Sequence, residues 1–203
     1  MNTHNKLTVL RMLLVPFFMA SLLITSLPHR FLIAAVIFGI ASLTDHYDGK
    51  LARKNGMITD FGKFLDPLAD KVLVLSALVC FVQLGLTGSV VVMIIITREF
   101  MVTSVRLVAV ESGKVIAANN WGKAKTVSQI VAILVVLVLQ YLKELVEMNL
   151  IPQSFVASFV PVDGLFTAFY VIGEIGLWIS VVFTVISGVI YIWDNRDFIK
   201  QAK

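Results

Sequence analysis

Four aspartates lie close together in the sequence, and apolar stretches border them on both sides. Asp45 and Asp48 are three residues apart, and Asp66 and Asp70 are four apart. On an α-helix, either spacing brings two side chains to the same face. Carboxylates next to apolar spans are costly unless they face a cavity or a partner, so they indicate a functional site. Hard divalent cations prefer oxygen ligands and bind substrate phosphates, and two of them can hold a phosphoryl group in place. The pattern therefore predicts metal-assisted phosphoryl chemistry.

Simpler explanations exist for each pair of acids. Asp66 followed by Pro67 is typical of a helix N-cap with proline at the first helical position. Asp45 and Asp48 would pair with basic neighbours at a helix end. His46 suggests zinc, but neither a cysteine nor a second histidine lies nearby in the sequence. Two helix-spaced acidic pairs at one membrane face favour the functional interpretation over these alternatives.

The elements that position these acids are predicted from composition and apolar length. Of the 203 residues, 58% are hydrophobic and only 15% are charged, whereas about a quarter are charged in a typical soluble domain. A membrane-spanning helix needs about 20 mostly apolar residues. Six segments meet this requirement, at 7–26, 31–51, 67–86, 89–110, 126–146 and 165–193. The sequence therefore predicts an all-α integral membrane protein with six transmembrane helices, forming one domain over residues 1–203.

The distribution of basic residues predicts the orientation. Six spans place both termini and the aspartates on one side of the membrane. Of the 17 lysines and arginines, only Arg30 and Lys143 fall on the other side, which leaves fifteen with the aspartates. Because basic residues collect in the cytoplasm, both termini are predicted to be cytoplasmic. The net charge of +4 then reflects topology, and no nucleic-acid partner is expected. The apolar segment 143–164 is expected to lie along the membrane interface.

The aspartates belong to a longer pattern that carries a resemblance. It reads Asp45-x2-Asp48-Gly49-x2-Ala52-Arg53-x8-Gly62-x3-Asp66-x3-Asp70. These eight positions and their spacing resemble the signature of the CDP-alcohol phosphatidyltransferase family. Such enzymes transfer the phosphatidyl group of a CDP-linked lipid to an alcohol and release CMP.

The resemblance implies a role for each signature residue. The four aspartates would hold two divalent metal ions, Mg²⁺ or Mn²⁺, and Asp70 would also be the general base. CDP-diacylglycerol would be bound by Asp45, Asp48, Gly49, Ala52, Arg53, Gly62 and Asp66. The family also implies a homodimer, with membrane lipid around it.

Basic residues outside the signature indicate an anionic acceptor. Arg98 and Arg106 are eight residues apart in the predicted fourth helix, so they point into the same half of it. The segments around them resemble bacterial family members that use glycerol 3-phosphate, which implies a bacterial cytoplasmic (inner) membrane with the site facing the cytoplasm. The acceptor-side candidates are Thr8, Arg11, Lys63, Arg98, Arg106, Lys123 and Lys125.

Three alternatives stay open. Another acceptor within the family, such as phosphatidylglycerol, serine or inositol phosphate, would keep the mechanism. An intramembrane prenyltransferase also uses aspartates and Mg²⁺, but its acidic motifs lack the Gly-x2-Ala-Arg element. An ion transporter would place acids near the middle of the bilayer, where Glu174 is the candidate.

Overall fold

The computed structural model describes residues 3–55, 60–111, 120–196 and 198, with side chains described outside 3–7, 45–55, 60–70, 110 and 111. All of the described regular structure is helical, as the sequence predicted. The helices are α1 (Thr3–Leu23), α2 (Arg30–Asn55), α3 (Asp60–Gln83), α4 (Ser89–Glu111), α5 (Asn120–Glu147), α6 (Gln153–Ala157) and α7 (Val162–Asp194).

The six long helices overlap the six predicted segments, but the structure adds a short helix and starts α3 and α5 six or seven residues earlier than predicted. The five-residue helix α6 lies in the segment expected at the membrane interface. Helix α3 begins at Asp60, seven residues before the predicted start. Asp66 and Pro67 therefore lie inside a continuous helix, and the N-cap interpretation of this pair is wrong.

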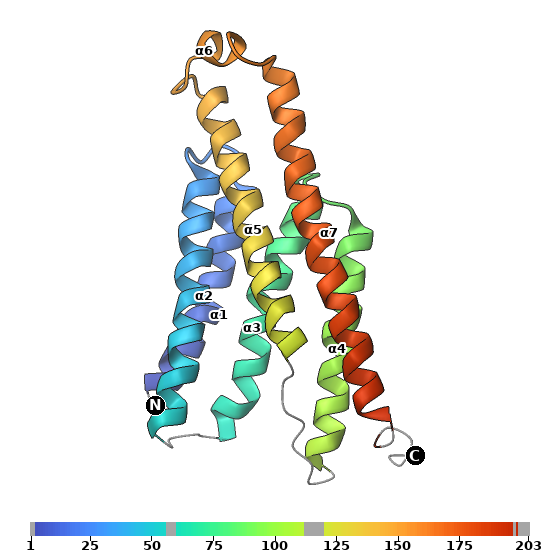
Figure 1. Cartoon of the computed structure of the whole chain (residues 1–203). Helices are drawn as coiled ribbons and strands as arrows, with labels where there is room; N and C mark the ends of the chain where they lie inside the picture. Colours follow the sequence, from blue (N-terminus) through green and yellow to red (C-terminus); the bar gives the residue numbers. More distant parts are fainter. Residues whose placement is uncertain (1–2, 56–59, 112–119, 197, 199–203) are drawn as a thin grey trace.

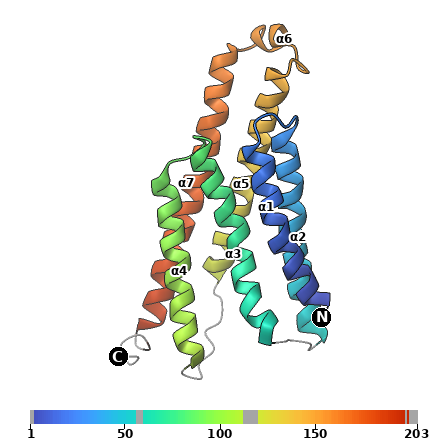
Figure 2. The ribbon, with the colours of Figure 1, turned by 180° about the vertical axis from the view of Figure 1, so that it is seen from behind.

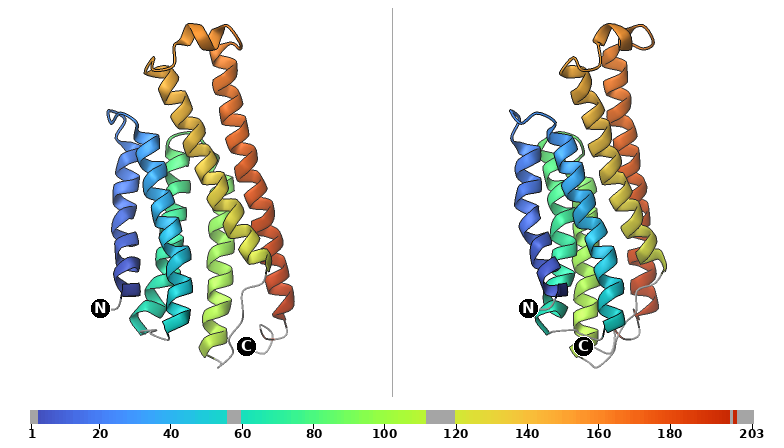
Figure 3. Two further views of the ribbon diagram at one scale, coloured as in Figure 1. Left: turned by 60° about the vertical axis from the view of Figure 1, so that its left-hand side comes forward. Right: turned by 90° about the vertical axis from the view of Figure 1, so that its left-hand side faces the viewer.

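The long helices run up and down in one bundle (Figure 1). Helix α1 begins and α7 ends at the same end of this bundle, where α2 leads to α3 and α4 leads to α5. We call this the motif end and the opposite one the far end. Seen from behind, α1 lies between α2 and α3 (Figure 2), and it packs against both. Helix α7 packs against α4 and α5. At the far end α5 and α7 extend beyond the other long helices and meet α6 (Figure 3).

Helix α7 carries polar residues on its inner face and apolar residues on its outer face. Ser180, Thr184 and Ser187 are fully buried, whereas Ile179 and Val189 are more than half exposed. A helix that faces water has the opposite distribution. The 33 residues of α7 span about 50 Å at 1.5 Å per residue. Among the described residues, α5 and α7 each contain an apolar stretch long enough to cross a membrane.

The far-end turns are fixed by residues with positive φ. Gly85 (φ 68°) follows α3, and the Leu86 N–H donates to the Phe81 carbonyl at 2.8 Å. Asn149 (φ 58°) ends α5 in the same way, with the Leu150 N–H on the Leu145 carbonyl. Both are left-handed C-caps, which favour glycine and asparagine. These caps set where the chain turns back toward the motif end.

Candidate functional site

The signature aspartates lie on two helices, of which α2 ends and α3 begins at the motif end (Figure 1). Asp45 and Asp48 are within α2, and Asp66 and Asp70 are within α3. Each pair falls within about one turn of an unbroken helix. The side chains of the four acids lie outside the described residues, as do those of Gly49, Ala52, Arg53, Gly62 and Lys63. The structure therefore shows where the backbone of these residues lies. The metal and substrate contacts of their side chains remain predictions.

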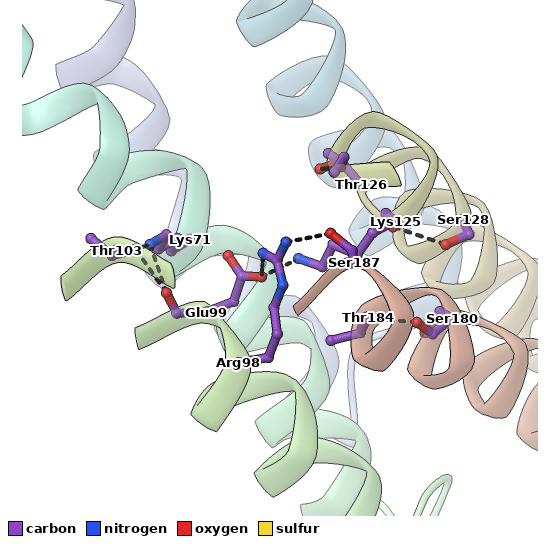
Figure 4. A network of polar contacts seen from close by, with 11 residues as sticks. Lys71, Arg98, Glu99, Thr103, Lys125, Thr126, Ser128, Ser180, Thr184 and Ser187 are labelled. Atoms are coloured by element: carbon purple, nitrogen blue, oxygen red, sulfur yellow. Dashed lines mark hydrogen bonds and ion pairs between the residues drawn. The ribbon is translucent and has the colours of Figure 1, made fainter. Parts of the chain in front are cut away.

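A cluster of charged side chains begins directly after the signature, and we call it the Glu99 cluster. It consists of Lys71, Arg98, Glu99 and Lys125 (Figure 4). Glu99 Oε1 accepts hydrogen bonds from Arg98 Nη1 at 2.8 Å and from Lys125 Nζ at 2.5 Å. The side chains of Glu99, Arg98 and Lys125 are 13%, 12% and 6% exposed. The cluster therefore lies inside the bundle, where charges need partners.

Lys71 connects this cluster to the signature. It is the residue after Asp70, and its side chain reaches from α3 to α4. Its Nζ donates to the main-chain oxygen of Glu99 at 3.3 Å and also to Thr103 Oγ1. The Thr103 hydroxyl in turn donates to the Glu99 carbonyl at 2.7 Å. The charged cluster and the aspartate signature are therefore adjacent parts of one region.

Helix α7 holds the Arg98 side chain from the other side. Arg98 Nη2 donates to Ser187 Oγ at 2.6 Å. A Cβ atom on Gly188 would lie only 3.0 Å from Arg98 Cγ, so the glycine leaves the space that the arginine stem occupies. Arg98 Nε is buried and has no hydrogen-bond partner. The guanidinium is thus fixed at both Nη atoms, and its buried Nε–H is left for a further acceptor.

The Glu99 cluster carries three basic groups and one carboxylate. Arg98 and Lys125 contribute +2 and Glu99 contributes −1, which leaves a formal excess of +1 among these three residues, and Lys71 lies beside them. An excess of buried positive charge is stabilised when an anion binds. Arginine and lysine are also the side chains that bind phosphate through charged hydrogen bonds. The arrangement is suited to a small phosphorylated ligand.

The structure brings some of the predicted acceptor-side residues together and separates others. Arg98 and Lys125 meet at Glu99, as described above. Thr8 and Arg11 are buried on α1. Lys123 is exposed, and Arg106 is also exposed, with its guanidinium 5.5 Å from the ring centre of Tyr191. Arg98 and Arg106 both contact α7, but Arg106 takes no part in the Glu99 cluster.

Sequence reasoning missed three residues near this site. Lys71 was grouped with the residues that set topology, although its position in an apolar helix is the same signal that singled out Arg98. Ser187 belongs to a polar stripe with Ser180 and Thr184, which helical spacing reveals in an otherwise apolar segment. Gln129 lies one turn after Lys125, and its Nε2 is buried without a hydrogen-bond partner. A buried glutamine in a spanning helix is a comparable signal.

The sequence also matches a known family over most of its length. A model of the CDP-alcohol phosphatidyltransferase family matches residues 1–186. The chain belongs to this family. The match covers both aspartate pairs and the whole Glu99 cluster, and it confirms the resemblance seen in the signature. Membership in the phosphatidyltransferase family removes the support for the prenyltransferase and ion-transporter alternatives.

Several curated proteins that are similar to this chain carry names of the same enzyme activity. A Bacillus subtilis (strain 168) protein named CDP-diacylglycerol–glycerol-3-phosphate 3-phosphatidyltransferase is 39% identical over 99% of this chain and 98% of its own length. A Haemophilus influenzae protein of the same name is 43% identical over 63% of this chain and 70% of its own. A Mycobacterium tuberculosis (strain H37Rv) protein named probable phosphatidylglycerophosphate synthase is 45% identical over 65% of this chain and 64% of its own.

Proposed function

We propose that this protein transfers the phosphatidyl group of CDP-diacylglycerol to sn-glycerol 3-phosphate, giving phosphatidylglycerophosphate and CMP. Family membership supplies the donor and the type of reaction. The observation that carries the choice of acceptor is the Glu99 cluster, in which two cations, Arg98 and Lys125, share the single Glu99 carboxylate. Glycerol 3-phosphate is a small anion that suits this charge. The names of the relatives agree with this choice.

The proposed arrangement is a six-span domain over residues 1–203 in the bacterial cytoplasmic membrane. Helices α1 to α5 and α7 would cross the bilayer, with the motif end and both termini in the cytoplasm. The exposed apolar residues of α7 and the basic residues near the motif end support this orientation. The donor's acyl chains would then stay in lipid while its cytidine reaches the aqueous phase. The resemblance further implies a homodimer.

The signature is chemically suited to divalent metal ions. Asp45, Asp48, Asp66 and Asp70 provide hard oxygen donors, and they lie on two helices of which α2 ends and α3 begins at the motif end. Mg²⁺ and Mn²⁺ both accept such a carboxylate set. When bound, the metal ions would neutralise the donor pyrophosphate and make CMP a better leaving group.

Asp70 is the residue proposed to handle the proton. The acceptor hydroxyl oxygen forms a bond to the phosphorus of the diacylglycerol phosphate, and the bond from this phosphorus to the CMP oxygen breaks. Asp70 takes the hydroxyl proton as that bond forms. Gly49, Ala52 and Gly62 would let the nucleotide come close to the backbone, and Arg53 would bind phosphate.

The Glu99 cluster is proposed to hold the phosphate of the acceptor. Arg98 and Lys125 would bind its oxygens, with Lys71 between them and the signature. Glu99 would then act as a positioning residue, because it holds both cations in one geometry before the ligand arrives. The remaining acceptor-side candidates are proposed to line the approach, namely Thr8, Arg11, Lys63, Arg106 and Lys123.

Release of CMP by the purified protein in detergent tests this function. The assay supplies CDP-diacylglycerol and Mg²⁺ and offers glycerol 3-phosphate, serine, inositol phosphate or phosphatidylglycerol separately. We expect release with glycerol 3-phosphate alone and none with a chelator. Release only with another acceptor would keep the reaction type and refute the acceptor. No release with any acceptor would refute the proposal as a whole.

A further inference from the structure

Two basic residues that are far apart in the sequence converge at the far end of the bundle. Arg30 starts α2 and Lys143 lies in the last turns of α5. They are the two basic residues that the charge distribution leaves on the side opposite the aspartates. Both line one pocket of about 110 Å³, together with Glu147. Two basic residues placed on this side by chance would not be expected to line the same pocket. Their convergence therefore indicates a binding site.

A mostly buried glutamine lines the same pocket. Gln140 is only 7% exposed and lines the pocket beside Arg30 and Lys143. Within the part of the chain that the structure describes, its side chain makes no hydrogen bond. An amide that lines a pocket without a hydrogen bond inside the protein has donors and an acceptor left for a ligand. The other wall is apolar and consists of Phe31, Leu84 and Leu86.

A second pocket of about 300 Å³ adjoins the first and shares Arg30, Phe31 and Glu147 with it. The turn between α1 and α2 forms its other wall. Within this turn His29 has a positive φ of 56°, and its Nδ1 lies 3.4 Å from the Tyr141 hydroxyl of α5. The two rings also pack edge to face. The turn is thereby held on α5, and the two pockets form one preshaped groove.

The two acidic residues of the groove, Glu144 and Glu147, have different partners. Glu144 binds the start of α2, because its carboxylate accepts from the Arg30 N–H at 3.1 Å and the Phe31 N–H at 3.4 Å. Glu147 contacts Lys143 at 3.6 Å, with both side chains at least one third exposed. Exposed pairs of this kind are weak, so both groups can exchange partners. Arg30 and Lys143 balance Glu144 and Glu147, and the groove is neutral overall.

We propose that this groove binds the headgroup of a zwitterionic phospholipid that carries a phosphate and a primary ammonium. The phosphate would lie between Arg30, Lys143 and the Gln140 amide. The ammonium would reach Glu147 in the second pocket. Exposed apolar residues border the groove, including Ile24 and Met148, and they give the acyl chains a lipid-facing surface. The proposal rests on the spanning arrangement above, but it concerns the end of the bundle opposite the transfer site.

Thermal unfolding of the full chain in detergent tests the ligand. We expect added phosphatidylethanolamine to raise the Tm more than phosphatidylcholine or phosphatidylglycerol does. Phosphatidylcholine has no N–H to donate, and phosphatidylglycerol has no cation for Glu147. Soluble glycerophosphoethanolamine and inorganic phosphate distinguish a lipid from a free phosphorylated compound. An equal shift with either soluble compound would overturn the assignment to a lipid, and equal shifts with all three lipids would overturn the headgroup assignment.

Two variants with matched controls locate the site. Gln140→Leu removes the amide that lines the pocket and should lose most of the Tm shift caused by phosphatidylethanolamine. Gln129→Leu removes an amide on the same helix outside the groove, so it should keep that shift. Lys143→Met should lose most of the shift and Lys123→Met should keep it. A full shift in both Gln140→Leu and Lys143→Met would overturn the proposal, and this outcome is independent of any transferase assay.

Discussion

Lys125 on α5 donates to Oε1 of Glu99 on α4 at 2.5 Å. The same carboxylate oxygen accepts from Arg98, which neighbours Glu99 in sequence. Helices α4 and α5 each pack against α7, so the contact between Lys125 and Glu99 links two helices across the interior of the bundle. One carboxylate thereby holds two cations that would otherwise repel each other. This relationship explains how a positively charged site is maintained before an anion binds.

Replacing Glu99 by glutamine should destabilise the ligand-free protein. The change leaves Arg98 and Lys125 close together without the carboxylate that pairs with both, and breaking a buried ion pair in this way costs about 3–5 kcal/mol. We expect a lower Tm, which glycerol 3-phosphate or phosphate restores in part because the anion takes the place of the carboxylate. Glu174→Gln is the control, since Glu174 binds Trp178 on the same helix. If Glu99→Gln were as stable as the parent, Glu99 would not hold the cluster together.

Replacing Lys125 by methionine should weaken the acceptor selectively. A hydrogen bond to a charged group contributes about 1.5–3 kcal/mol, so we expect the KM for glycerol 3-phosphate to rise roughly 10- to 100-fold. The KM for CDP-diacylglycerol should change little, because the donor is proposed to bind the signature. Steady-state CMP release measures both constants. Thr126→Val alters the exposed neighbour on the same helix and should change neither. Equal losses for both substrates would argue against an acceptor site at Lys125.

A third prediction concerns the contact between Gly188 and Arg98. In Gly188→Ala the added Cβ would lie 3.0 Å from Arg98 Cγ, so the arginine stem has to move. We expect a KM for glycerol 3-phosphate that rises by about one order of magnitude, since a small misplacement of a binding group is costly. Gly176→Ala on the same helix is the control, because its nearest contact would be an ordinary 3.8 Å. An unchanged KM in Gly188→Ala would show that the Arg98 position does not limit acceptor binding.

The six long helices could be predicted because each contains a long apolar stretch, although among the described residues only those of α5 and α7 are long enough to cross a membrane. The start of α3 could not, because Asp60, Lys63 and Asp66 make its first two turns polar. Helix α6 was missed because five residues are too few for a periodic pattern. In both cases the local sequence resembles a loop, and tertiary context decides the structure.

The candidate site, like the fold, could be predicted from the sequence only in part. The aspartate pairs and Arg98 are ionisable residues beside or within apolar spans, and this signal is visible in the sequence. Which cations share a carboxylate depends on how α3, α4, α5 and α7 pack, and spacing along one helix does not contain that information. Arg106 shows the limit, because it shares the α7-facing half of α4 with Arg98 and still contacts Tyr191 instead of the cluster. The helical spacing of an ionisable residue thus predicts the side on which it lies more reliably than its partner.

The last prediction separates proton transfer from donor binding at Asp70. Asp70→Asn keeps the size and the hydrogen-bonding capacity of the side chain but cannot take a proton from the acceptor hydroxyl. Loss of general-base assistance lowers the rate by about 10²- to 10⁴-fold, so CMP release should become nearly undetectable. The Tm shift caused by CDP-diacylglycerol should largely survive, because the other three aspartates remain. Asp60→Asn makes the same change at the first residue of α3 and should retain activity. Substantial turnover in Asp70→Asn would mean that another group takes the proton, whereas loss of both turnover and the donor shift would assign Asp70 to donor or metal binding alone.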